Sequence, residues 1–384
     1  MSDRTHISWA DTTWPITVGC DKVSPGCYDC YAMRDARRME SNPNPKISSV
    51  YSGLVTKQAN GILNWTGAVK TLPERLSDPA HWKEHRDIFV CSQSDLFHKD
   101  VPGAFIGQVF SAIWNYSWHT YYILTKRPER LLELLEGTPP EGLADFNSIN
   151  FPHVIVGVSA EDQATAEKRL PLLTQLPLAS SQLFVSAEPL IGPLDLSKWL
   201  DRLGWVIAGG ESGKHARPMH PDWPRRLRDQ CEEARVSYHF KQWGEFTTEL
   251  PGAEAEMIEE AGAPLYRLKP GKSRKPVPTL IQDRTTFYRV GRRKAGRILD
   301  GQYWNARPGA DDGPTYAPHP LHAEVTVNES AGHEYSGAVG IITTIRPDNP
   351  ATREIDGEEA SYWITAGGRE LPQAFSYWQI EPKH

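Results

Sequence analysis

From residue 87 onward, the chain repeats one pattern of hydrophobic and polar positions. A short apolar run, rich in β-branched and aromatic residues, is followed by a polar loop and then by a segment with helical periodicity. Apolar runs occupy residues 87–91, 121–124, 153–158, 182–185, 205–208 and 237–240, and helical segments occupy residues 105–116, 129–135, 164–173, 194–203 and 223–234. Nearly continuous apolar strands that alternate with helices are typical of buried parallel strands joined by crossover helices.

A further strand at residues 6–10, ahead of the first cysteine, brings the predicted number of parallel strands to about seven. The pattern therefore predicts an α/β fold, a full or partial (β/α) barrel, with an open doubly wound sheet as the alternative. We predict a (β/α) core over residues 1–246, which contains a cysteine loop at residues 19–32. Residues 247–308 are expected to form a loop or insertion and a basic closing segment of the core. Residues 309–384 are expected to form a small, acidic, mainly β extension.

Polar, charged or glycine residues follow every predicted strand, where the carboxyl ends of parallel strands bind ligands. One such group could be an ordinary loop or helix cap, because serine and aspartate often cap helices. Six groups in register favour a shared binding face. Its candidate residues are Ser94, Asp95, Lys126, Arg127, Ser159, Glu161, Glu188, Gly209, Gly210, Glu211 and Lys241.

Charge and composition exclude some classes of protein. The sequence has no apolar run long enough for a membrane span and no secretory signal at its N-terminus, so we expect a cytoplasmic protein with no membrane partner. The net charge is −6, yet residues 266–297 contain eleven lysines and arginines against the single acid Asp283. Such a basic segment could bind a nucleic acid. The favoured explanation is that it is a solvated face that packs on acidic parts of the same chain.

Three of the five cysteines lie within eleven residues, as Cys20, Cys27 and Cys30. Six residues separate the first pair and two separate the second, and Pro25 and Gly26 supply a turn between them. In a reducing cytosol, cysteines serve metals or catalysis more often than disulfides. We expect the other two, Cys91 and Cys231, to be buried thiols that pack as small apolar groups.

Three interpretations of this loop compete. Structural zinc needs four ligands, and no second cysteine pair exists, although His6, His98, His215 or His220 could supply a fourth. A disulfide would leave the third thiol unpaired. A 4Fe–4S cluster held by three cysteines leaves one iron open for chemistry, and the ligand count favours this interpretation.

The cysteine loop and the residues at the strand ends together resemble those of a known class of enzymes. A Gly-Cys…Gly-Cys-x-x-Cys-Tyr-Ala loop ahead of a βα repeat resembles radical S-adenosylmethionine (radical SAM) enzymes of the TIM-barrel type. More closely, the chain resembles a phage- and prophage-encoded family of radical-SAM-like proteins with a three-cysteine motif. The likeness covers about residues 1–308. The matching stretches are residues 14–32, 92–98, 124–130, 157–162, 185–193, 205–219, 240–245 and 290–304.

The resemblance implies a radical SAM enzyme in which Cys20, Cys27 and Cys30 are the metal ligands and catalytic residues. The open iron would chelate S-adenosylmethionine, and one electron from a donor such as flavodoxin or ferredoxin would yield a 5′-deoxyadenosyl radical. The implied cofactor contacts are Ser94, Asp95, Ser159, Glu161, Glu188, Gly209, Gly210 and Glu211. Lys126, Arg127 and Lys241 would meet an anionic substrate group or form ion pairs with those carboxylates.

The sequence departs from the commonest radical SAM pattern, because the first gap is six residues instead of three and Asp29 replaces an aromatic before Cys30. A longer gap enlarges the loop without removing a ligand. The phage setting of the similar family implies DNA modification or repair, with a nucleobase or DNA as substrate. The alternative is a non-catalytic protein that carries zinc or a cluster and binds a phage or host partner.

Overall fold

The computed structural model describes residues 5, 7–59, 61–248, 285–300 and 303–307, and the backbone of further strands between residues 255 and 382. Two compact units divide the chain: residues 1–296 with 307–310, and residues 297–306 with 311–384. In the described ranges, no helix is long and apolar enough to cross a membrane.

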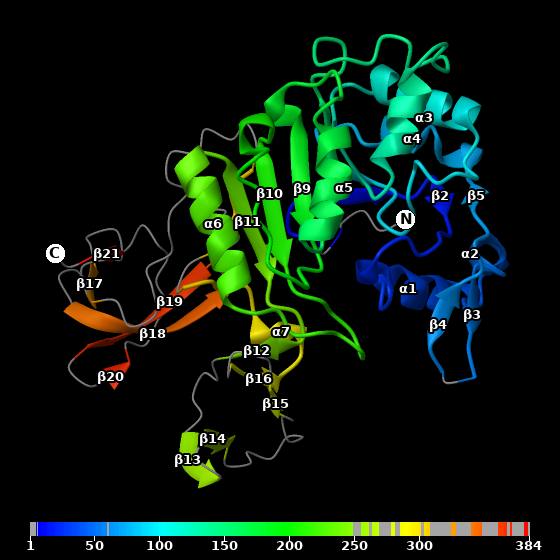
Figure 1. The fold of residues 1–384 in the computed structure, drawn as a ribbon. Coiled ribbons are helices and arrows are strands. Elements are labelled where there is room, and N and C mark those ends of the chain that lie inside the picture. The colour runs from blue at the N-terminus through cyan, green and yellow to red at the C-terminus, as the bar shows by residue number, and fades with distance from the viewer. Residues whose placement is uncertain are drawn as a thin grey trace. The chain divides into compact units, whose positions relative to one another are not determined.

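A curled sheet of seven parallel strands forms the centre of the first unit (Figure 1). Its strands, in spatial order, are β1 (Thr12–Trp14), β6 (Asp87–Val90), β7 (Thr120–Thr125), β8 (Val154–Ser159), β9 (Leu183–Ala187), β10 (Trp205–Gly209) and β11 (Ser237–Gln242). The order follows the chain without reversal, so the sheet curls in one direction into half of a barrel. The predicted α/β class and all six apolar runs are confirmed, and the barrel is partial.

The four crossover helices α3 (Gly103–Asn115), α4 (Pro128–Leu135), α5 (Gln163–Leu173) and α6 (Asp222–Ala234) cover one face of this sheet (Figure 1). The predicted helix at residues 194–203 is wrong. That segment contains only the 3-10 turn Leu200–Arg202, because side chains bind its backbone N–H groups. Gln230 accepts the N–H of Leu196 at 2.7 Å, and the carboxylate of Asp195 accepts that of Ser197 at 2.9 Å. Extended backbone then buries the leucines against the sheet.

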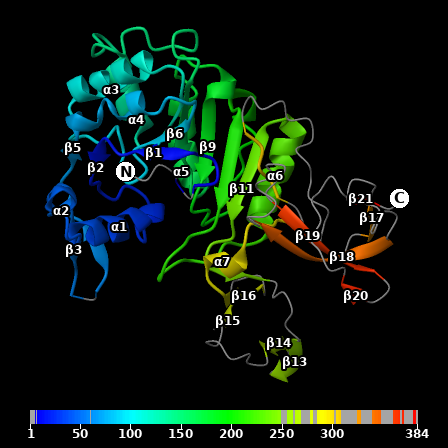
Figure 2. The same cartoon turned by 180° about the vertical axis from the view of Figure 1, so that it is seen from behind.

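The other face of the sheet is closed by the N-terminal segment, which lies in front of the strands in Figure 2. Trp9 is 2% exposed, and its ring centroid lies 4.7 Å from Phe89, 5.6 Å from Tyr122 and 5.9 Å from Trp205. The predicted strand at residues 6–10 is therefore wrong. Trp9 instead packs against the concave face of the sheet, and the first strand begins at Thr12.

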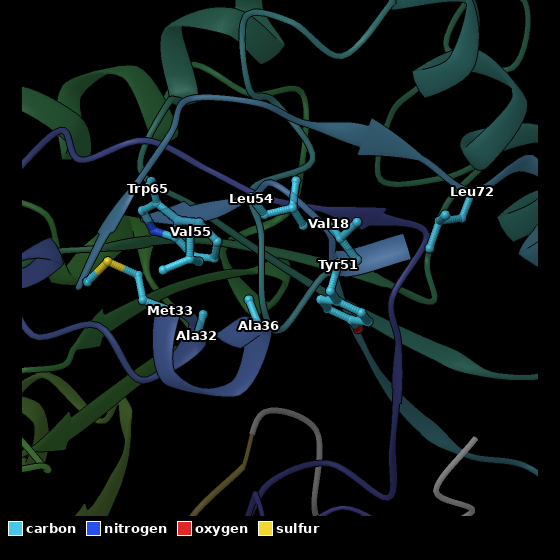
Figure 3. Close-up of a cluster of buried hydrophobic side chains, with 9 residues drawn as sticks. All are labelled: Val18, Ala32, Met33, Ala36, Tyr51, Leu54, Val55, Trp65 and Leu72. Carbon is cyan, nitrogen blue, oxygen red and sulfur yellow. The ribbon is translucent and has the colours of Figure 1, made fainter. Parts of the chain in front are cut away.

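A separate apolar cluster lies between β1 and β6 in the chain and supports the cysteine loop (Figure 3). It is formed by α1 (Tyr31–Glu40), α2 (Pro45–Tyr51), the hairpin β3 (Val55–Lys57)–β4 (Leu63–Trp65) and the pair β2 (Thr17–Val18)–β5 (Lys70–Thr71). Met33, Leu54 and Trp65 are among its buried side chains. Cys20 and Cys30 pack against it, so the loop rests on a rigid base.

The chain after β11 forms smaller antiparallel sheets. One contains β12 (Phe246–Thr247), β16 (Thr286–Arg289) and β15 (Pro278–Leu280), and β13 (Ala255–Glu260) pairs with β14 (Ala263–Leu268). The short helix α7 (Arg292–Ala295) follows β16. The second unit contains a five-stranded sheet in the order β20 (Arg369–Glu370), β19 (Ala360–Ala366), β18 (Val339–Pro347), β17 (Glu324–Val327) and β21 (Ile380–Pro382). The domain boundaries given above stay predictions. The remaining 3-10 turns are Pro25–Cys27, Pro73–Arg75, Asp78–His81 and Ser180–Gln182.

Candidate functional site: a cysteine loop at the strand ends

The three-cysteine loop begins at the carboxyl edge of the sheet. Gly19 forms a parallel bridge with Ser94, which follows β6. Gly19 has a φ of +89°, and a Cβ there would clash with the carbonyl of Ala68, so no other residue fits this turn. A 3-10 turn at Pro25–Cys27 then folds the loop back on itself. Cys27 is buried, and Cys20 and Cys30 are half-buried.

Arg127 fixes the Cys20 end of the loop. Its guanidinium lies 2.9 Å from a carboxylate oxygen of Asp95, pairs with Asp21 and approaches the sulfur of Cys20 at 3.9 Å. Asp95 in turn accepts hydrogen bonds from the hydroxyl of Thr125 at 2.7 Å and from a backbone N–H. His98, whose pKa is lowered by burial, lies 3.2 Å from Asp21 without the alignment of a hydrogen bond. The ends of β6 and β7 thus hold this side of the loop.

Glu161, which follows β8, fixes the middle of the loop. Its side chain is fully buried and accepts hydrogen bonds from Ser24 at 2.6 Å and Arg169 at 2.8 Å, and it also pairs with Lys126. Burial alone would raise the pKa of Glu161, but Lys126 and Arg169 lower it to about 2. The carboxylate is therefore charged and fully bonded, and three chain segments meet at it.

Residues after β10 fix the last part of the loop. Arg217 pairs with Glu211 at 2.6 Å and donates a hydrogen bond to the carbonyl of Pro25 at 3.0 Å. Asp29 pairs with Arg34 at 3.2 Å and accepts the backbone N–H of His215 at 3.3 Å. The loop is thus held by residues that follow four different strands: β6, β7, β8 and β10.

The three thiols differ in how readily they ionise. Burial and the nearby Asp95 carboxylate raise the pKa of Cys20 to about 12, and burial also raises the pKa of Cys30. Burial opposes the thiolate of Cys27, but the Lys126 ammonium and hydrogen bonds from the backbone of Val23 and from Ser24 lower its pKa overall. Cys27 is therefore the thiol that ionises most readily of the three.

The donor set suits an iron–sulfur cluster held by three thiolates. Within the described residues, no three His, Cys, Asp or Glu side chains are grouped to hold a metal ion, so the sulfur atoms must turn toward one another to share one cluster. The negative charges of Cys30 and Cys27 contribute to the raised pKa of Cys20, which places the thiols within electrostatic range of one another. Lys126 and Arg127 lie beside them and offset the negative charge that three thiolates bring.

The predicted cofactor-binding carboxylates all have partners within the protein. Asp95, Glu161 and Glu211 hold the loop as described above, and Glu188 pairs with Lys241 at 3.0 Å. Ser94 shares a 2.7 Å hydrogen bond with Thr17. Lys126, Arg127 and Lys241 therefore form the ion pairs given as the alternative to substrate binding. Whether any of these groups also contacts a ligand stays a prediction.

The predicted glycines are explained by close packing. A Cβ at Gly209 would lie 2.6 Å from the carboxylate of Glu188, and one at Gly210 would clash with the carbonyl of Trp243. Ser159 is buried at the end of β8, beside Ser186 of β9 in the sheet register. The carbonyl of Ser159 accepts a hydrogen bond from the guanidinium of Arg169 at 2.8 Å, and contact of its hydroxyl with a ligand stays a prediction.

Sequence reasoning missed several residues that hold the loop, among them Asp21, Ser24, Arg169 and Arg217. Arg169 gave a signal, because it occupies a position on α5 beside the buried Leu170 and Leu173, where an arginine is rare without a partner. Arg217 had no local signal, because its partners are Glu211 and the distant Pro25.

Fold and site together define an α/β protein with a partial parallel barrel and a three-cysteine loop anchored at its carboxyl edge. Residues 4–308 match a family described as "Protein of unknown function (DUF5131)". The match covers more than half of the chain, and the chain belongs to this family. No curated protein and no solved structure matches it.

Proposed function

We propose that this protein is a radical SAM enzyme whose cluster is held by Cys20, Cys27 and Cys30. One observation carries the proposal: a three-cysteine loop is fixed by buried ion pairs over the carboxyl ends of a parallel half-barrel. Ligands of such sheets bind at this edge. A loop that needed only to bind zinc for stability would not require the fully buried Glu161 and further ion pairs of Asp95, Arg127 and Glu211 to hold it.

The residues of this chain would act in three ways. The thiolates of the three cysteines would bind three irons, and Lys126 and Arg127 would lower the cost of their combined negative charge. Glu161 and Arg217 would hold the loop in place at the carboxyl edge of the sheet through Ser24 and Pro25. When bound, the cluster would supply the electron that cleaves the sulfonium of S-adenosylmethionine, and Ser159 is the first candidate to contact that cofactor.

The cluster would receive its electron from a small redox protein of the flavodoxin or ferredoxin type. Cys20 and Cys30 are half-buried, and Tyr28 beside Cys27 is 62% exposed, so the loop has an accessible side for such a donor. A reducing compartment suits exposed thiolates of this kind, and we therefore propose a cytoplasmic location.

Anaerobic reconstitution with iron and sulfide tests the proposal. We expect brown protein with about four irons and four sulfides per chain, and release of 5′-deoxyadenosine when S-adenosylmethionine and a reductant are added. Cys27→Ala should abolish both signals without unfolding the protein. Cys231→Ala is the matched control, because Cys231 is buried within α6, far along the chain from the cysteine loop, and its loss should leave both signals intact.

Two outcomes would overturn the proposal. A colourless protein that retains zinc after reconstitution would support the non-catalytic binding protein instead. A cluster that forms with equal iron content in the Cys27→Ala variant would show that this loop does not hold it.

A further inference from the structure

Residues 212–217, which follow β10, connect the cysteine loop with the basic segment that follows β16. On one side, the backbone N–H of His215 donates to Asp29 of the cysteine loop, and Arg34 of α1 donates to the carbonyl of Ser212 at 3.3 Å. Arg217 reaches Pro25, as described above. This connecting loop, residues 212–217, is thus part of the same edge as the cysteines.

On its other side, the connecting loop is joined to α7 through Glu245. The carboxylate of Glu245 accepts the backbone N–H of Gly213 at 2.9 Å, and its carbonyl accepts the N–H groups of Val290 and Gly291. An apolar cluster of Ala216, Phe246 and Phe287 packs the two segments together. Lys214, next to Gly213, is therefore held close to Arg292, next to Gly291.

Exposed cations gather on these two adjoining segments. Lys214, His215, Arg292 and Arg293 are all exposed. Within the part of the chain that the structure describes, no carboxylate pairs with Lys214, Arg292 or Arg293. The cations nearer the cysteines are different, because Lys126, Arg127 and Arg217 are paired with acids. The charge of Lys214, Arg292 and Arg293 is therefore not neutralised by a carboxylate within the described fold. It would attract an anion with several spaced charges.

Exposed aromatic rings flank the cysteines on the same edge. Tyr28 is 62% exposed and Tyr31 is 43% exposed, and they stand beside Cys27 and Cys30 in the chain. The hydroxyl of Tyr31 donates to the carbonyl of Ser92, which holds its ring in place. Exposed rings beside a group of cations are the combination on which single-stranded nucleic acids stack their bases and place their phosphates.

We propose that the basic rim formed by Lys214, His215, Arg292 and Arg293 binds the phosphates of a single-stranded nucleic acid, with bases stacked on Tyr28 and Tyr31. The base nearest Tyr31 would then lie beside the cysteine loop. A duplex fits less well, because its bases are already stacked on each other and cannot cover the two rings. The inference that this nucleic acid is the substrate rests on the proposed function. The inference that the protein binds it does not.

Fluorescence anisotropy with a labelled single-stranded DNA oligonucleotide tests the binding on the full chain. The triple variant Lys214→Ala, Arg292→Ala, Arg293→Ala should bind roughly tenfold or more weakly, and the slope of log affinity against log salt should fall by about 2 because each lost phosphate contact removes about 0.7. Tyr28→Ala should weaken binding between about fivefold and about a hundredfold, whereas Tyr28→Phe, which keeps the ring, should bind as the wild type does.

The matched control is the triple variant Lys168→Ala, Lys198→Ala, Arg235→Ala, which removes the same charge from exposed positions elsewhere. Equal weakening in the two triple variants would overturn the proposal, because overall charge would then explain the binding. Absence of binding to the wild type, or tighter binding of a duplex of the same sequence, would also overturn it.

Iron and sulfide content, measured on the same samples, separates this inference from the proposed function. A protein that holds the cluster and releases 5′-deoxyadenosine but does not bind the strand would refute the rim alone. A protein that binds the strand through the rim but never holds a cluster would refute the enzyme alone.

Discussion

A Cβ atom added to Gly26 would lie 2.5 Å from both Cγ and Oε1 of Glu161. Contact with the end of a flexible side chain is usually relieved by a change of rotamer. Glu161 has no such freedom, because Arg169 and Lys126 bind its carboxylate and the side chain is fully buried. The cysteine loop therefore lies against the one carboxylate of its surroundings that is least able to move.

Gly26→Ala should displace the cysteine loop and leave the barrel folded. The added methyl group can be accommodated only if the Pro25–Cys27 turn moves away from the sheet, which separates Cys27 from its neighbours. We expect a large loss of iron after reconstitution, with a far-ultraviolet circular dichroism spectrum like that of the wild type. Gly103→Ala, whose Cβ would meet the movable end of Leu134 at 3.1 Å and Pro140 at an ordinary contact distance of 3.7 Å, should keep normal iron content.

Glu161→Gln should lower the free energy of unfolding by about 3 kcal/mol at neutral pH, since it leaves two buried cations without their counter-charge. The pKa of Glu161 is about 2 in the folded protein and about 4.3 when unfolded. Its contribution is therefore fully present above pH ~5 and is lost as the pH falls through about 2. Urea unfolding of the wild type and the variant should show a difference that shrinks on acidification.

The control for this prediction is Glu167→Gln on the same helix, whose side chain is exposed. It should change stability by less than about 0.5 kcal/mol at every pH. A wild-type advantage over Glu161→Gln that grows on acidification would contradict the assigned charge.

Arg127→Lys should weaken the Cys20 end of the loop while keeping its charge. A lysine ammonium cannot bridge Asp21 and Asp95 as the guanidinium does, so one of the two carboxylates loses its ion pair at a cost of about 1–3 kcal/mol. We expect a lower melting temperature and faster loss of iron to a chelator. Arg130→Lys, at a surface pair with Glu133 one turn further on, should behave like the wild type in both measurements.

Trp9→Ala should destabilise the barrel without a specific effect on the cysteines. Removal of the ring opens the aromatic cluster on the concave face, and such truncations cost about 3–5 kcal/mol. Urea unfolding should detect this loss, while protein that stays folded should retain its iron content. A variant of wild-type stability would show that the N-terminal segment does not fill the concave face.

The strands from residue 87 onward could be predicted because both faces of a half-barrel are covered, so each strand is an unbroken apolar run. The same reasoning failed at residues 6–10 and 194–203. Trp9 and the leucines after Pro193 are buried as strongly as strand or helix residues, but their backbone groups bond elsewhere. The hydrophobic pattern of a sequence indicates which residues are buried, but it does not indicate which backbone groups form hydrogen bonds with one another.

The position of the candidate site could be predicted from the polar strand ends, whereas its internal pairing could not. From the sequence alone, charged side chains such as Glu161 and Arg127 are interpreted as ligand contacts. Their partners in the protein cannot be recognised, because they lie more than a hundred residues away or on another loop. Only the folded chain shows that Glu161 meets Ser24 and that Arg127 meets Asp21.

The apolar cluster behind α1 has a consequence for the chemical durability of a bound cluster. Cys20 and Cys30 pack against the apolar cluster of Val18, Met33 and their neighbours, which is drawn in Figure 3, so this side of the two thiols is closed to dioxygen and chelators. Tyr28 and Tyr31, which neighbour the cysteines in the chain, are exposed. Anything that covers those two rings would then shield the iron from oxidative attack. The half-life of the cluster in air should lengthen when that side is occupied.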